Sequence, residues 1–130
     1  MLRQDSRRTR VLLIESAGSR REALQTFLER CGYSVESAAD GATGLRMAMT
    51  WRPEAAVVTT DVRPGGGYAQ ALCLRGALGS GIVLINRTQP GQPVDRQRAR
   101  AAGFDHLLTA DADPAELHEF LQATKADPAA

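Results

Sequence analysis

The chain lacks several features that would point to a stapled, secreted or membrane-bound protein. It has two cysteines in 130 residues, Cys31 and Cys73. Two cysteines give little support to a disulfide framework or a metal site, so we expect reduced, buried thiols. The opening segment MLRQDSRRTR contains no apolar stretch of the secretory type, and no apolar run approaches membrane-spanning length. We therefore expect a cytoplasmic chain that does not contact a membrane.

The chain also lacks a dominant charge. Sixteen basic and fifteen acidic residues leave a formal net charge of +1, which gives no overall electrostatic reason to expect direct binding to nucleic acid. The distribution is uneven, because arginines crowd the first ten residues and acids crowd the segment DADPAELHEF. We interpret residues 1–9 as a basic, solvated N-terminal arm and residues 125–130 as a C-terminal tail.

Between the arm and the tail, strand-like and helix-like segments alternate with short links. The strand-like runs are VLLIE (11–15), YSVESA (33–38), AAVVTT (55–60), GIVLIN (81–86) and FDHLLT (104–109). Such alternation is typical of a parallel sheet covered by helices, and 130 residues suffice for one domain with its own core. We predict one domain over residues 10–124 with the α/β flavodoxin-like (βα)5 fold. This is a three-layer sandwich with a five-stranded parallel sheet of order 2-1-3-4-5.

Several residues indicate where helices begin and end. Ser19 and Glu22 have the spacing of a capping box at the start of the first helix. Gly103 is placed to end the fourth helix (92–103), and Asp113 followed by Pro114 to begin the fifth.

In an open parallel sheet, the carboxyl ends of the strands meet at one rim, where sites usually lie. The polar residues predicted there are Glu15, Ser16, Thr59, Thr60, Asn86 and Thr109. The stretch AAVVTTDVRPGGG (55–67) adds Asp61, directly after the third strand. Asp61 is therefore either a reactive carboxylate or the first solvated residue after a core strand.

The order of the segments resembles a response-regulator receiver domain of two-component signalling, over about residues 10 to 123. The resemblance is carried by VLLIES, AADG (38–41), RPEAAVVT, GY (67–68), AAGFDHLLT and DPAELHEFL. It implies a bacterial signalling module that binds a sensor kinase, an output domain or a second copy of itself.

The resemblance also implies a particular chemistry. In the family, an aspartate at the end of the third strand becomes an acyl phosphate. A magnesium ion is held by that aspartate and two acids after the first strand. A hydroxyl on the fourth strand and a lysine on the fifth contact the phosphoryl oxygens.

This sequence departs from the family pattern at those positions. The degenerate phosphorylation pocket consists of Glu15 and Ser16 at the acid pair, Thr59 at the acceptor, Asn86 at the hydroxyl and Ala110 at the lysine. Leu107 stands at the aromatic switch position of the fifth strand. Because threonine cannot form an acyl phosphate, we expect a pseudo-receiver: not an enzyme, with no metal and no cofactor, that acts through protein–protein interaction.

Two other interpretations stay open. Under a shifted register, Asp61 would be the phosphoacceptor of a working receiver, and magnesium would then be required. Alternatively, the domain could bind a small ligand on the same flavodoxin-like fold.

Charged side chains suggest how the domain works without phosphorylation. Arg87 follows the fourth strand, and we expect it to pair with Glu15 or Asp61, in place of metal and lysine. The resemblance implies a partner surface made by the fourth helix, fifth strand and fifth helix, through which a homodimer could form. On that surface lie Leu107, the basic residues Arg96, Arg98 and Arg100, and the acidic residues Asp113, Glu116 and Glu119.

Overall fold

The computed structural model of the chain describes residues 8–59, 61–63, 65–88, 95–109 and 112–125. It contains a single parallel sheet with strand order β2-β1-β3-β4-β5, as predicted. The strands are β1 (Arg10–Ile14), β2 (Ser34–Ala38), β3 (Ala55–Thr59), β4 (Val83–Thr88) and β5 (His106–Thr109). The helices are α2 (Gly18–Arg30), α3 (Gly41–Trp51), α4 (Gly66–Leu78), the short 3₁₀ turn η1 (Gly79–Gly81), α5 (Arg96–Ala102) and α6 (Pro114–Lys125).

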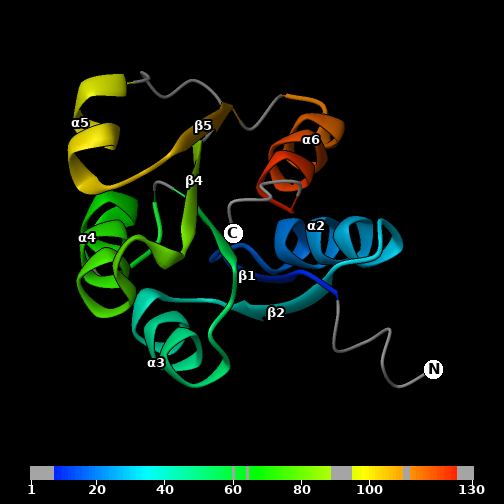
Figure 1. Cartoon of the computed structure of the whole chain (residues 1–130), viewed down its shortest axis with the longest axis horizontal. Helices are drawn as coiled ribbons and strands as arrows, with labels where there is room; N and C mark the ends of the chain where they lie inside the picture. The colour runs from blue at the N-terminus through cyan, green and yellow to red at the C-terminus, as the bar shows by residue number, and fades with distance from the viewer. Residues whose placement is uncertain (1–7, 60, 64, 89–94, 110–111, 126–130) are drawn as a thin grey trace.

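Helices cover both faces of the sheet, with α3, α4 and α5 on one side and α2 and α6 on the other (Figure 1). Successive side chains of a strand point to opposite faces, so each strand contributes to two cores. Leu12 and Val58 belong to the core under α3, α4 and α5, whereas Leu13 and Val57 belong to the core under α2 and α6. All five residues of β3 are buried, as expected of a central strand covered on both faces.

Most of the predicted helix boundaries are confirmed. Gly103 ends α5 in the left-handed conformation (φ 107°), and Asp113 Oδ1 accepts a hydrogen bond from the Ala115 N–H at the start of α6. At the start of α3, Asp40 Oδ1 accepts the Thr43 N–H at 2.8 Å. The capping box predicted at Ser19 and Glu22 is wrong: α2 begins at Gly18 after Ala17 and has no side-chain cap. Ser19 therefore lies inside the first turn, where it cannot act as the cap.

Two further expectations need correction. Strand β4 continues to Thr88, two residues beyond the predicted end, because Arg87 and Thr88 pair with Leu108 and Thr109 of β5. Arg87 is thus part of the strand rather than the loop after it. The cysteines are free thiols, but Cys73 is exposed on α4 and Cys31 is only partly buried.

The ends of the predicted domain fall partly outside the described residues. Residues 1–7 of the arm and 126–130 of the tail lie outside them. Two internal residues named above, Thr60 and Ala110, also lie outside the described residues. Thr9, which we assigned to the arm, is buried, and its carbonyl accepts the N–H of Ser34, the first residue of β2. Within the described segments, every helix is too short or too polar to cross a lipid bilayer.

Arg75 near the end of α4 ties together the segments that lead into the last two strands. Its Nη1 donates to the carbonyls of Gly79 and Ile82 at 2.8 and 2.7 Å. Its Nη2 donates to the Gly103 carbonyl at 2.6 Å and to Asp105 Oδ2 at 3.0 Å. The segments just before β4 and just before β5 are therefore hydrogen-bonded to the same guanidinium group.

Candidate functional site

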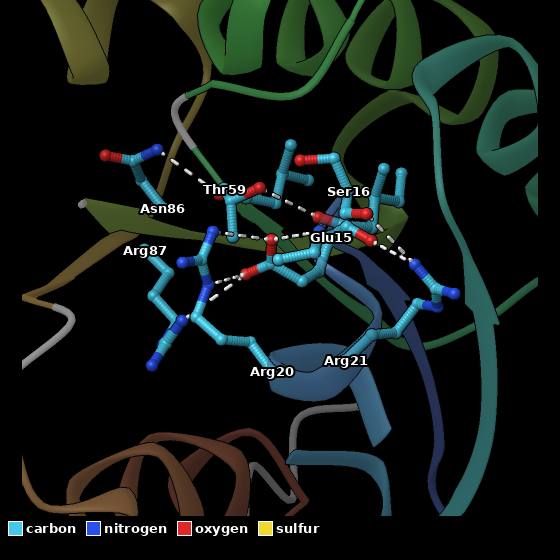
Figure 2. A network of polar contacts seen from close by, with 10 residues as sticks. Glu15, Ser16, Arg20, Arg21, Thr59, Asn86 and Arg87 are labelled. Atoms are coloured by element: carbon cyan, nitrogen blue, oxygen red, sulfur yellow. Dashed lines mark hydrogen bonds and ion pairs between the residues drawn. The ribbon is translucent and has the colours of Figure 1, made fainter. Parts of the chain in front are cut away.

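The candidate site lies where β1, β3 and β4 end. Glu15 directly follows β1, Thr59 is the last residue of β3, and Arg87 is the next-to-last residue of β4. Alternation along the strands places Thr59 and Arg87 on the same face as Val57 and Ile85, which is the face covered by α2 and α6. Figure 2 shows Glu15, Thr59 and Arg87 gathered at this edge.

The carboxylate of Glu15 is inaccessible to solvent and is held by two arginines (Figure 2). Arg20 donates from Nε to Oε1 and from Nη2 to Oε2, both at 3.2 Å. Arg87 donates from Nη1 to Oε1 at 3.4 Å, and the Ala17 N–H donates to Oε2 at 3.0 Å. We call Glu15, Arg20 and Arg87 the Glu15 cluster. A buried carboxylate is costly without such partners, and here it has cations from α2 and from β4.

The predicted ion pair between Arg87 and Glu15 is confirmed, but sequence reasoning missed Arg20. Arg20 lies in the first turn of α2, five residues after Glu15. The neighbouring Arg21 also reaches back and donates from Nη1 to the Glu15 carbonyl at 2.8 Å. Two consecutive arginines in the turn after an isolated acid are the signal that could have indicated this arrangement.

The two arginines of the cluster have different electrostatic surroundings. The hydrogen bond to Glu15 raises the pKa of Arg20, whose side chain is 38% exposed. Burial lowers the pKa of Arg87, whose side chain is 16% exposed; the attraction of Glu15 opposes this effect and the repulsion of Arg20 adds to it. Arg87 is thus held as a cation in surroundings that disfavour positive charge.

Thr59 and Asn86 direct their side chains at the sheet backbone. The hydroxyl of Thr59, which is buried, donates to the Ile14 carbonyl at 3.3 Å. Asn86 is also buried, and its Nδ2 donates to the Val58 carbonyl at 3.3 Å. Asn86 lies one residue before Arg87 and therefore faces the opposite side of the sheet. Ser16 is exposed, and Ala110 lies outside the described residues.

Asp61 lies beyond the sheet, two residues after the end of β3, and is exposed. Its negative charge contributes, after the larger effects of Glu15, to the raised pKa of Arg20. Val62, the next residue, is buried in the core under α3, α4 and α5.

The described residues do not fit a magnesium ion. Magnesium prefers several oxygen ligands in a regular octahedral arrangement, whereas the Glu15 carboxylate already contacts two guanidinium groups and a backbone N–H. The Thr59 hydroxyl is directed at a backbone carbonyl. In the part of the chain that the structure describes, no three or more His, Cys, Asp and Glu side chains gather as metal ligands would.

The predicted partner surface is only partly continuous. Arg96, Arg98 and Arg100 are all exposed on α5, but Arg98 lies over the Tyr68 ring of α4, 4.7 Å from its centroid. Arg96 and Arg100, four residues apart, share a face of the helix. All three predicted arginines are thus exposed, and Arg98 in addition contacts Tyr68 of α4.

The other predicted members of that surface divide between the two faces of the sheet. Leu107 of β5 pairs in register with Asn86 and packs against the core under α3, α4 and α5. The acidic residues are exposed as well: Asp113 lies just before α6, and Glu116 and Glu119 lie on α6, which covers the opposite face.

Comparison with known proteins gives relatives in sequence. No protein-family model matches the chain. The transcriptional regulatory protein CseB of Streptomyces avermitilis is 33% identical over 109 residues, covering 84% of this chain and 46% of that protein. The CseB protein of Streptomyces coelicolor gives the same identity and coverage. The chain thus spans about half the length of the curated relatives it matches.

Solved structures give the same result for the fold. The receiver domain of the sensor histidine kinase PA1611 from Pseudomonas aeruginosa, which holds a coordinated magnesium ion, superposes with a TM-score of 0.80 at 26% identity, covering 89% of this chain and 96% of that one. A putative response regulator from Chloroflexus aurantiacus gives a TM-score of 0.84 at 21% identity, covering 92% of this chain and 99% of that one. In fold and in sequence, the chain is similar to response-regulator receiver domains of two-component signalling.

Proposed function

We propose that this domain is an atypical receiver that acts as a phosphorylation-independent protein-interaction module. The observation that carries the proposal is the Glu15 cluster, in which one buried carboxylate is balanced by Arg20 and Arg87. In the family chemistry described above, an acid in this place contributes to magnesium binding. Here the cations come from the chain itself.

The side chain at the predicted acceptor position supports the same proposal. Thr59 is buried, and its hydroxyl is hydrogen-bonded to β1. Phosphorylation of an aspartate works because a carboxylate oxygen can attack phosphorus and form an acyl phosphate. A threonine hydroxyl that is engaged by the backbone offers neither the carboxylate nor access for the phosphodonor.

The Glu15 cluster would hold the rim in one arrangement, since it joins the start of α2, the end of β1 and the end of β4. A receiver switches because a new charge at the rim changes these contacts. With the charges already balanced internally, regulation would come from which partner is present. The partner is a sensor kinase, an output domain such as the remainder of the longer relatives, or a second copy of the domain.

For self-association we propose the face formed by α5, β5 and α6. Exposed Arg96 and Arg100 on α5 and exposed Glu116 and Glu119 on α6 could pair symmetrically between two copies, where such charges set specificity more than affinity. Light scattering of the wild type and of an Arg96→Glu, Arg100→Glu variant tests this face. A dimer that persists unchanged in the variant would exclude it.

The function is tested with phosphodonors that need no kinase. The wild type is incubated with acetyl phosphate and magnesium, and separately with beryllofluoride and magnesium, and followed by intact mass and by amide NMR spectra. A phosphorylation-competent receiver domain serves as the control for the reagents. We expect neither an added phosphoryl mass nor a beryllofluoride-dependent spectral change.

The alternative, a working receiver with Asp61 as acceptor, predicts the opposite outcome. Asp61 is exposed and close enough to influence Arg20, so a donor could reach it. A phosphoryl mass that appears in the wild type and disappears in Asp61→Asn would establish this alternative and refute the pseudo-receiver. The Asp61→Asn variant removes one carboxylate and leaves the Glu15 cluster in place.

A further inference from the structure

A small cavity opens beside the Glu15 cluster, between α2, β4 and the first turn of α6. Its volume is about 170 Å³, and it is lined by Arg20, Ala23, Leu24, Phe27, Arg87 and Pro114. The lining has two distinct parts. Two guanidinium groups supply its polar part, and the remaining four side chains are apolar.

The charges around this cavity favour an anion. Both charged residues in its described lining are arginines, while Glu15, their shared partner, is not in contact with the cavity. Burial lowers the pKa of Arg87, and the charge of Arg20 adds to this effect. A second negative charge on the cavity side would therefore offset an existing electrostatic cost.

Glu15 itself shows that a carboxylate suits these two arginines. Its oxygens lie 3.2 to 3.4 Å from nitrogens of Arg20 and Arg87. Each guanidinium has five N–H donors in a planar fork, and the contacts with Glu15 use two donors of Arg20 and one donor of Arg87. The same pair can face Glu15 on the sheet side and a second anion on the cavity side.

We propose that this cavity binds a small organic anion, with its carboxylate against Arg20 and Arg87 and a compact apolar body against Leu24 and Phe27. An apolar cavity of roughly 150 Å³ is enough for a guest the size of benzene, so a single ring or a short branched chain fits the available volume. The proposal does not depend on the absence of phosphorylation, because none of the lining residues is a candidate phosphoacceptor.

The test uses benzoate as the probe, titrated into the whole chain and followed by amide NMR shifts. Benzyl alcohol has the same ring without the charge, and acetate has the charge without the ring. We expect saturable shifts in α2 and the first turn of α6. Benzoate should bind at least tenfold more tightly than either comparison compound, since hydrogen bonds to charged groups and burial of the ring each contribute.

Two variants connect the binding to the cavity. Ala23→Leu enlarges a side chain of the cavity lining while keeping both arginines, and Ala42→Leu adds the same volume on α3, outside that lining; both alanines are exposed. We expect benzoate affinity to fall at least tenfold in Ala23→Leu and to stay within twofold of the wild type in Ala42→Leu. Arg87→Met, checked for folding by circular dichroism, should also lose at least tenfold.

The proposal is overturned by absence of saturable benzoate binding to the folded wild type. It is equally overturned if benzyl alcohol binds as tightly as benzoate, or if Ala23→Leu binds benzoate as the wild type does. The phosphodonor experiment on Asp61 can succeed or fail without changing any of these results.

Discussion

Replacing Glu15 by glutamine tests how much the Glu15 cluster contributes to stability. Glutamine has nearly the same shape but no charge, so the substitution removes three charged contacts of 3.2, 3.2 and 3.4 Å. It leaves two guanidinium groups close together without the carboxylate between them. Losing one partner of a buried ion pair typically costs about 3–5 kcal/mol.

Two features of the structure reduce the energetic cost that we expect at this site. The contacts are longer than the roughly 2.8 Å of strong bonds between a cationic nitrogen and a carboxylate oxygen. Arg20 is also 38% exposed, so water screens part of its attraction to Glu15. We therefore expect Glu15→Gln to lower the free energy of unfolding by about 2–3 kcal/mol. For 130 residues, this corresponds to a fall in Tm of about 7–11 °C.

Urea unfolding at neutral pH measures the effect, and a double-mutant cycle assigns it to the ion pair. Glu15→Gln and Arg87→Met are measured singly and together, and we expect a coupling energy of at least about 1 kcal/mol. The matched control replaces Arg87→Met by Arg98→Met, because Arg98 lies over Tyr68 on the other face of the sheet. That pair should be additive within about 0.5 kcal/mol. Additivity of Glu15→Gln with Arg87→Met, or a Tm shift no larger than that of Arg98→Met, would refute the stabilising role.

Two other predictions concern the helices that support the rim. A methyl group at Gly44 of α3 would overlap the side chain of Ile14, so Gly44→Ala should lower the free energy of unfolding in urea by about 1–3 kcal/mol. The control is Gly76→Ala, which should be neutral or stabilising because its methyl group would meet nothing within 4 Å. Equal effects at both glycines would contradict this prediction. Asp40 caps α3 through the Thr43 N–H, and that bond holds the pKa of Asp40 below its ordinary value of 3.8. Its stabilising effect is therefore present above that value and lost as the pH falls through the lower folded-state pKa. The Tm difference between the wild type and Asp40→Ala should shrink at strongly acidic pH, and a constant difference would exclude the carboxylate as its cause.

The strands, their parallel arrangement and the position of the rim could be predicted because they depend on local patterns. Continuous apolar runs such as AAVVT identify a strand buried on both faces, and the alternation with helical segments implies a parallel sheet. The end of β4 was harder to predict, since Arg87 and Thr88 are polar. Their place in the strand comes from pairing with β3 and β5, which only the folded sheet reveals.

The site could be predicted in part. The ion pair of Arg87 could be predicted because Arg87 directly follows the predicted end of the fourth strand, and a residue in that place must lie at the rim. Arg20 was missed because its direction depends on where α2 begins, and the sequence suggested Ser19 rather than Ala17 as the residue before the helix. Of the two candidate acceptor positions, Thr59 lies within β3 and is buried, and Asp61 lies beyond it and is exposed.

The guanidinium of Arg75 supports one edge of the sheet. Strand β5 is an edge strand of only four residues, and a detached edge strand exposes apolar side chains and unpaired backbone to other chains. Arg75 holds both Gly103 and Asp105 just ahead of β5, and Asp105 also accepts the Leu84 N–H of β4, so separating β5 breaks contacts that it shares with β4. One partly exposed side chain thus protects the domain from edge-to-edge aggregation by coupling a short strand to the stability of its neighbour.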